Sequence, residues 1–278
     1  MSESNSNNLK AENPIGIFDS GIGGLTVAHA IKELLPEEQL IYFGDTAHLP
    51  YGDKASYSIK HYATELSKFL LDQGCKVIVI ACHTASSVAN EEVKSVVGDQ
   101  ALVINVVEPV IGKLIRESQN GGKKVGIIGT KGTIQSEVYP TRLSAQDESI
   151  EVRPLATPLL CPMIEEGFID DRISETVIES YLKQDQLSAI NKIVLACTHY
   201  PLIKKQIDNY YQGGVEIIDS SEEAAMHLKE LLTEHNLLNQ KLSKEHHFYV
   251  SDYTPSFEKS THFFFGEKVK LEKGSIWS

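Results

Sequence analysis

The chain has 278 residues, of which 41% are hydrophobic and 23% charged, which is typical of a globular protein with one large or two small domains. The net charge of −12, with no cluster of Lys or Arg, argues against a nucleic-acid partner. The longest apolar run, VIVIAC, is much shorter than the roughly 20 residues of a membrane helix, and we identify no leader. We therefore expect a cytoplasmic protein without a membrane partner.

Short β-branched runs alternate with amphipathic stretches along the chain. Residues 1–14 are polar and end at Pro14, and we expect them to form a disordered N-terminal tail. The runs IGIF, LIYFG and KVIVIA are each followed by a helix-like stretch, and the pattern resumes at KVGIIG, EVRPLA and KIVLAC. This order predicts a doubly wound α/β fold with mainly parallel sheets and helices on both faces.

Two segments of the first half recur in the second half. The sequence of Ile15–Gly23 is echoed by Val125–Thr133, and that of Ile80–Thr84 by Leu195–His199, at offsets of 110 and 115 residues. Strand-then-glycine turns are common, but a cysteine at the same place in both repeats is harder to assign to packing alone. We therefore expect two pseudo-symmetric α/β domains with the active site in the cleft between them.

The segment after the second repeat should pack back on the first unit. The predicted first domain then comprises residues 15–108 plus 220–278, and the second comprises residues 109–219. Two chain crossings between these domains suit a hinge or shear motion around the cleft.

Polar side chains follow three of the expected strands. In open parallel sheets, ligands bind beyond the carboxyl ends of the strands. Each group is also expected to open a helix, whose free N–H groups and partial positive charge suit a carboxylate. These residues are Asp19 and Ser20, then Cys82, His83 and Thr84, and finally Cys197, Thr198 and His199.

Two other chemistries compete for these side chains. The loop DSGIGG could cradle a phosphate, but the GxGxxG pattern needs glycine where Thr26 stands, and Asp19 would repel a phosphate. Metal binding is disfavoured because CH and CTH spacings differ from the paired ligands of structural zinc. We therefore expect neither a nucleotide nor a metal, although competent metal ligands are present at Asp19, Cys82, His83, Cys197 and His199.

The remaining chemistry is proton transfer by thiols. The four cysteines show no CxxC spacing, so we expect them to be reduced. A helix N-terminus or a neighbouring histidine lowers a thiol pKa from about 8.5 and yields a thiolate base. If Cys82 and Cys197 lie on opposite sides of one carbon, one can remove a proton while the other delivers one. Cys75 is expected to pack in the core, Cys161 has no assigned role, and a structural role is expected for His246 and His247.

Several motifs together resemble the glutamate racemase family. They are IGIFDSGIGGLTV, GDTAHLPYG, IACHTAS, GTKGTIQSEVY, PMIEEG, ACTHYPL and FYVSDYTPSFEKSTHFFFGE. The resemblance covers nearly the whole chain after residue 14 and presents the motifs in the family's order. It implies racemisation of glutamate without pyridoxal, metal or nucleotide cofactors, and supply of D-glutamate for peptidoglycan.

The resemblance also implies roles for individual residues. Cys82 would be the base toward D-glutamate and Cys197 the base toward L-glutamate. Asp19 would assist Cys82 and His199 would assist Cys197, with Glu165 as a further carboxylate in the site. The implied substrate contacts are Ser20, Tyr51, Gly52, Thr84 and Thr198, and we also expect Asp19, His83 and His199 to contact the substrate.

One position departs from the family pattern, which reads Cys-Asn-Thr where this chain has Cys82, His83 and Thr84. The imidazole could donate to the substrate carboxylate or raise the thiolate fraction of Cys82. Two alternatives stay open: a racemase for aspartate or another small acid, and a regulatory relative without turnover. A homodimer is compatible with the sequence, which does not fix the oligomeric state.

Overall fold

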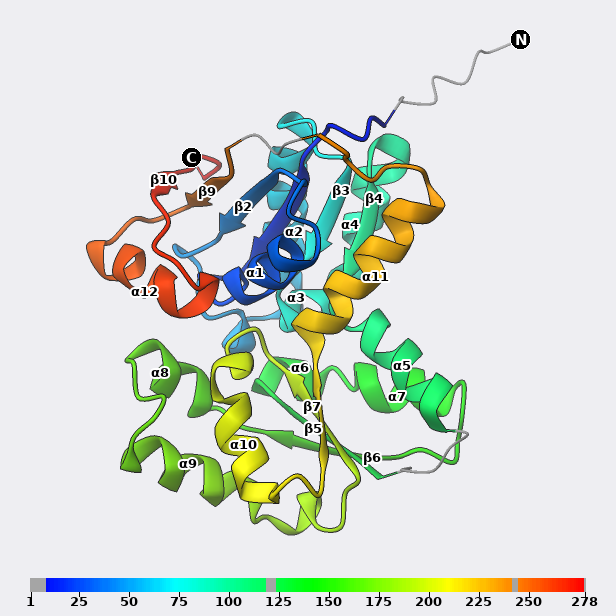
Figure 1. Cartoon of the computed structure of the whole chain (residues 1–278), viewed down its shortest axis with the longest axis vertical. Helices are drawn as coiled ribbons and strands as arrows, with labels where there is room; N and C mark the ends of the chain where they lie inside the picture. Colours follow the sequence, from blue (N-terminus) through cyan, green and yellow to red (C-terminus); the bar gives the residue numbers. More distant parts are fainter. Residues whose placement is uncertain (1–8, 119–123, 242–244, 278) are drawn as a thin grey trace.

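The computed structural model describes residues 9–118, 124–241 and 245–277, which form two parallel β-sheets with helices on both faces (Figure 1). The strand order is β10-β9-β2-β1-β3-β4 in one sheet and β6-β5-β7-β8 in the other. All paired strands run parallel, so the predicted fold class is confirmed. The strands are β1 (Ile15–Asp19), β2 (Leu40–Gly44), β3 (Val77–Ile80), β4 (Leu102–Asn105), β5 (Lys124–Gly129), β6 (Glu151–Ala156), β7 (Lys192–Ala196), β8 (Glu216–Asp219), β9 (His247–Val250) and β10 (Leu271–Lys273).

Helices connect successive strands and cover the sheets. The α-helices are α1 (Leu25–Leu34), α2 (Ser56–Asp72), α3 (His83–Val88), α4 (Asn90–Val97), α5 (Glu108–Ser118), α6 (Lys131–Gln135), α7 (Val138–Ser144), α8 (Leu160–Glu165), α9 (Arg172–Leu182), α10 (Lys204–Tyr211), α11 (Ser220–Glu234) and α12 (Pro255–Phe265). Short 3-10 turns occur at η1 (Tyr51–Asp53), η2 (Gly98–Gln100), η3 (Asp185–Leu187) and η4 (Tyr200–Ile203). Among the described helices, none is long and apolar enough to cross a membrane.

The central strands of the first sheet are buried on both faces. Along β3, Val77 and Val79 join the apolar cluster that contains helices α1, α11 and α12, whereas Ile78 and Ile80 join the cluster under α2 and α4. Successive side chains of a strand point to opposite faces, so a strand covered on both sides reads as an unbroken apolar run. This explains why the run KVIVIA shows no polar alternation.

The two sheets share one topology. The order β2-β1-β3-β4 matches β6-β5-β7-β8, which places the two repeated sequence segments at equivalent strands. The chain leaves the four-stranded half after β8 and continues into α11, which packs along α1 of the other half (Figure 1). Strands β9 and β10 then extend the first sheet from the edge of β2. These contacts support our proposal of one domain from residues 15–108 and 220–278 and another from residues 109–219.

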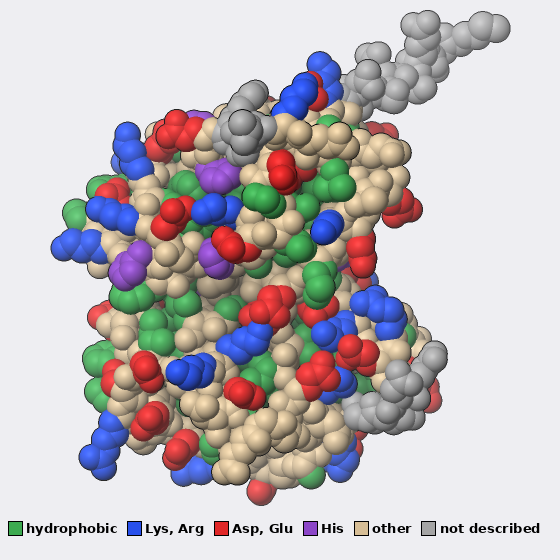
Figure 2. Space-filling view, viewed as in Figure 1, with side chains coloured by type: hydrophobic (Ala, Val, Ile, Leu, Met, Phe, Trp, Pro, Cys, Tyr) green, Lys and Arg blue, Asp and Glu red, His purple; other side chains and the backbone are tan. Residues whose placement is uncertain are grey.

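Charged side chains of both signs are intermixed over the two halves on the face seen in Figure 2. Among the described residues, several oppositely charged side chains are within ion-pair distance, such as Lys204 and Glu222 at 2.6 Å. Surface pairs of this kind contribute little to stability, because water and salt screen them.

A buried ion pair ties the amino ends of the strands together, at the end of the first sheet opposite Asp19. The ammonium of Lys76 lies 2.6 Å from Glu38, and both side chains are at most 1% exposed. Lys76 also donates to the carbonyls of Ala11 and Leu237, and Glu38 accepts from the Asn239 amide. Of the expected tail, residues 1–8 lie outside the described residues, whereas Ala11 contacts the buried Lys76.

We expect Lys76→Met to destabilise the fold by about 3–5 kcal/mol, because it leaves the Glu38 carboxylate buried without its cation. Urea denaturation followed by circular dichroism measures the change. Adding Glu38→Gln to this variant should recover part of the loss, since the neutral amide keeps hydrogen-bonding capacity without the charge. A loss below about 1 kcal/mol for the single variant would contradict this account of the pair.

Candidate active site

A cavity of about 220 Å³ between the two halves contains nearly all of the predicted site residues. Both Cys82 and Cys197 line it, so the structure brings the two repeated strand ends to one space. Asp19 is the exception: it does not line the cavity, although the neighbouring Ser20 and Gly21 do. The other predicted residues in the wall are Ser20, Tyr51, Gly52, His83, Thr84, Glu165, Thr198 and His199.

Cys82 is the N-cap of helix α3. Its sulfur accepts a hydrogen bond from the Ala85 amide at 3.5 Å and lies 3.7 Å from the Ser20 hydroxyl. Burial raises the pKa of Cys82 to about 12, and the carboxylate of Asp19 adds to this rise. The expectation of a lowered pKa was therefore wrong here, because the loss of solvation outweighs the helix N-terminus.

Asp19 ends strand β1 and is 1% exposed. Its Oδ2 accepts from the amides of Gly21 and Gly24 at 3.2 and 3.0 Å, whereas its Oδ1 has no hydrogen-bond partner among the described residues. Burial raises the pKa of this carboxyl, against the lowering effect of His199. Helix α1 begins only at Leu25, so Asp19 and Ser20 do not open a helix as expected.

Cys197 follows strand β7 and is 6% exposed. Its sulfur lies 3.2 Å from the Cys161 sulfur and 3.7 Å from Nδ1 of His199. Burial, followed by the neighbouring Cys161, raises the pKa of the Cys197 thiol, whereas His199 opposes this rise. The turn after Cys197 is the 3-10 segment η4, not the α-helix that was expected.

His199 connects Cys197 to a carboxylate. Its Nε2 lies 2.9 Å from Oε1 of Glu165, and its ring packs edge-on against Phe264 at 5.3 Å between centroids. Burial lowers the pKa of His199, but the hydrogen bonds with Cys197 and Glu165 outweigh it and raise the pKa to about 10. The imidazolium is thus the group best placed to support a Cys197 thiolate. Glycine is needed at Gly23, where a Cβ would lie 2.4 Å from the ring.

His83 differs from the expectation for this position. Its side chain is buried at the start of α3, and neither ring nitrogen has a hydrogen-bond partner among the described residues. Burial lowers the pKa of His83 to about 3, so its ring is neutral near neutral pH. A neutral imidazole cannot raise the thiolate fraction of Cys82 by its charge, and only the predicted hydrogen bond to a substrate stays open.

A cluster of three threonines joins the two halves beside the cavity. The Thr84 hydroxyl lies 3.0 Å from that of Thr130 and 3.3 Å from that of Thr133. The backbones meet closely here, because a Cβ at Gly52 would lie 2.9 Å from Thr130. Sequence analysis missed Thr130 and Thr133, although the recurring motif GTKGT contains both.

Tyr51 is held by a buried carboxylate that sequence analysis also missed. Its hydroxyl donates to Asp45 at 2.6 Å, and Asp45 further accepts from Ser251 at 2.8 Å and from the indole of Trp277 at 2.9 Å. The motif GDTAHLPYG contains Asp45 and Tyr51, but its link to the C-terminal residues is a tertiary contact. The C-terminal segment thus supports one wall of the cavity.

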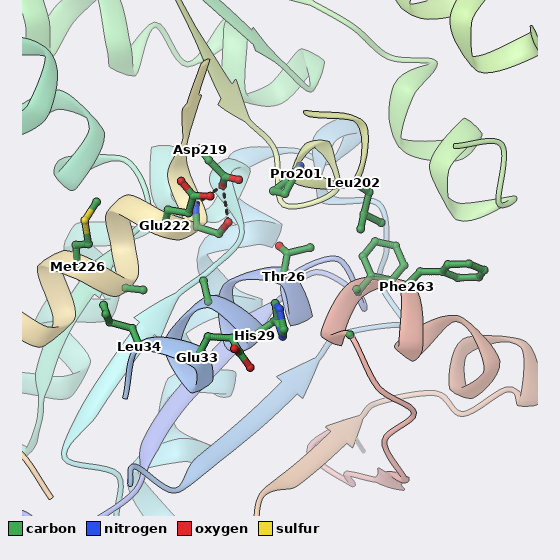
Figure 3. Close-up of a pocket in the computed structure, with 15 residues that line it drawn as sticks. Thr26, His29, Glu33, Leu34, Pro201, Leu202, Asp219, Glu222, Met226 and Phe263 are labelled. Atoms are coloured by element: carbon green, nitrogen blue, oxygen red, sulfur yellow. Dashed lines mark hydrogen bonds between the residues drawn. The ribbon is translucent and has the colours of Figure 1, made fainter. Parts of the chain in front are cut away.

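A larger cavity of about 680 Å³ lies between α1, η4, α11 and α12 (Figure 3). Its lining includes the apolar side chains of Leu34, Leu202 and Phe263 and the carboxylates of Asp219 and Glu222. No cysteine lines it, so we assign the chemistry to the smaller cavity.

Three side chains in the smaller cavity could hold a metal ion. The ligating atoms of Cys161, Cys197 and His199 all lie within 4.8 Å of one another. This set differs from the metal ligands considered from the sequence, because Cys161 takes the place of Cys82, His83 and Asp19.

Known proteins resemble the chain along most of its length. A sequence model of the Asp/Glu/Hydantoin racemase family matches residues 23–228. A glutamate racemase of Chlorobaculum parvum is 41% identical over 94% of this chain and 95% of its own. The structure of a glutamate racemase from Francisella tularensis in complex with D-glutamate has a TM-score of 0.88 and 37% identity, over 96% of this chain and 98% of that one. For the Thermus thermophilus glutamate racemase in complex with β-chloro-D-alanine, the TM-score is 0.84 at 36% identity, with coverage of 96% and 98%. With a cavity that presents two cysteines from equivalent strand ends, this chain belongs to the Asp/Glu/Hydantoin racemase family.

Proposed function

We propose that the protein is a glutamate racemase that interconverts L- and D-glutamate by proton transfer between two thiols, without a cofactor. The observation that carries this proposal is that Cys82 and Cys197 reach one cavity from equivalent strands of two sheets. The relatives named above are glutamate racemases, and one of them was solved with D-glutamate. We further propose that the reaction occurs in the cytoplasm and supplies D-glutamate for peptidoglycan.

In this proposal the two thiols exchange roles with the direction of the reaction. For L-glutamate, the Cys197 thiolate removes the α-proton and the Cys82 thiol delivers a proton to the opposite face. For D-glutamate, Cys82 is the base and Cys197 the acid. His199 stabilises the Cys197 thiolate. The carboxylate of Asp19 raises the pKa of Cys82 and so favours the protonated thiol over the thiolate.

Local donors would bind the substrate carboxylates, since a net charge of −12 gives no long-range attraction for an acid. Ser20, Thr84 and Thr198, which carry hydroxyls, line the cavity from both halves. We propose that they orient glutamate together with Tyr51, Gly52, His83 and His199.

The central test is racemisation by purified protein after exhaustive dialysis against a chelator. We expect full activity on glutamate from either enantiomer, because both acid/base groups are side chains. Circular dichroism of the amino acid and exchange of its α-proton in deuterated water follow the reaction, with aspartate as the comparison substrate. Activity that returns only on addition of zinc or pyridoxal phosphate would refute the cofactor-independent mechanism. Faster turnover of aspartate than of glutamate would make aspartate the substrate.

We expect His83→Asn to keep kcat/KM within about tenfold of the wild type, or ~1.4 kcal/mol. The ring of His83 is neutral and makes no hydrogen bond to a described residue, so the asparagine amide would leave no group without its partner. Initial rates in both directions measure the effect. A loss of several orders of magnitude would assign His83 an essential role.

Replacement of either cysteine by serine should cripple racemisation in both directions, because the reaction needs a donor and an acceptor. Elimination from a 3-substituted glutamate needs only one base, since the leaving group departs after one deprotonation. Cys197→Ser should therefore retain elimination from the D-configured analogue, and Cys82→Ser from the L-configured one.

Formation of the ketoacid product measures this elimination. Equal residual elimination from both configurations in each variant would refute the assignment of one thiol to each face. A reversed preference would keep two-thiol catalysis and exchange the labels.

A further inference from the structure

Cys161 is a thiol at the centre of the site that the proposed reaction does not use. It lies in α8, is half-buried, and its sulfur is 3.2 Å from the sulfur of Cys197. Nδ1 of His199 lies 3.7 Å from the same Cys197 sulfur. All three side chains line the cavity, and their ligating atoms fall within 4.8 Å of one another.

These distances are near those of a tetrahedral zinc site. Bonds of about 2.3 Å to sulfur and about 2.05 Å to nitrogen place two sulfurs about 3.8 Å apart, and a sulfur and a nitrogen about 3.6 Å apart. The distance between Cys197 and His199 already matches at 3.7 Å. The two sulfurs, at 3.2 Å, need to separate by about 0.6 Å to match. Cys161 can supply this shift because it is only half-buried on a short helix.

The second shell of the histidine also fits a metal. Nδ1 of His199 faces the sulfurs, whereas Nε2 lies 2.9 Å from Oε1 of Glu165. Histidines that bind metals usually donate their other ring N–H to a carboxylate, which fixes the tautomer and the ring orientation. Glu165 therefore holds the ring with Nδ1 toward the two thiols, and this nitrogen gives up its proton when it binds a metal ion.

We propose that Cys161, Cys197 and His199 form an inhibitory site for Zn²⁺, with a fourth position open to the cavity. Two thiolates and an imidazole select a soft or borderline cation such as zinc and disfavour Mg²⁺ and Ca²⁺. A zinc ion here engages the electron pair of Cys197 that proton transfer requires. The predicted metal binding depends only on the three ligands. The predicted inhibition depends also on the proposed racemase activity.

Metal binding is tested on the purified, chelator-treated protein with a phosphine reductant present to keep the thiols reduced. Co²⁺, which reports on zinc sites, should bind with one equivalent and give thiolate-to-cobalt charge-transfer absorbance in the near ultraviolet. Zn²⁺ should displace it, and the same zinc concentration should inhibit racemisation reversibly on addition of a chelator. Mg²⁺ should do neither.

Variants separate this site from nonspecific thiol binding. Cys161→Ser should weaken zinc binding by more than the about 10–100-fold that loss of a second-shell partner costs, and Glu165→Gln should weaken it within that range. The matched control is Cys75→Ala, which removes a buried thiol outside the cavity and should leave zinc affinity unchanged.

Equal zinc affinity of the wild type and Cys161→Ser would overturn the proposal, as would bound Co²⁺ without charge-transfer absorbance. Inhibition that a stronger reductant reverses and a chelator does not would instead identify oxidation of the thiols, and would also overturn it. Stoichiometric binding to a protein without racemase activity would keep the metal site and reject the proposed function. Racemisation that zinc leaves unaffected would keep the proposed function and overturn the inhibitory site.

Discussion

The burial of two thiols is the constraint on which the site depends. Cys82 and Cys197 are each about 5% exposed, so a thiolate at either position loses most of its hydration. Each thiolate therefore needs hydrogen-bond donors or a positive charge from the protein to stabilise it when it forms. Donors fixed in an enclosed site can stabilise developing charge without having to reorganise.

The two thiols receive unequal support. Cys197 has a cationic imidazole beside it, whereas Cys82 has an amide, a hydroxyl and the carboxyl of Asp19. In the proposed reaction the enantiomers have equal free energy in water, so kcat/KM must be the same in both directions. The asymmetry of the site can then appear only as parallel changes: the enantiomer with the higher kcat also has the proportionally higher KM.

Polar residues that follow buried strands meet at the carboxyl edge of a parallel sheet, so strand positions alone predicted the fold and both cysteines of the cavity. Tyr51, Gly52 and Glu165 were predicted only from the family resemblance. The directions of the thiol pKa shifts were predicted wrongly, because a motif reveals a helix N-terminus but not how much water reaches it. The contact of Cys161 with Cys197 could not be predicted from the sequence, because the two residues are 36 positions apart and share no repeat or motif spacing. A polar composition also does not reveal a tertiary contact such as that of the Ala11 carbonyl, which accepts from the buried Lys76.

Contacts between the halves explain why small residues recur around the cavity. Gly52 and Gly132 let two backbones approach, with a Cβ at either position falling within 3.0 Å of the opposite half. The hydroxyl of Thr84 then reaches Thr130 directly. A larger residue at either glycine would force the halves apart and widen the space between the two thiols.

The contacts of the C-terminal segment bear on the order in which the protein becomes complete during synthesis. Phe264 packs on His199, and Ser251 and Trp277 hold the carboxylate that positions Tyr51. Both cysteines leave the ribosome well before these residues, and domains fold as the chain emerges. A nascent chain can therefore hold both thiols in folded sheets while His199 and Tyr51 still lack their supports, so assembly of the reaction centre waits for the final stretch of translation.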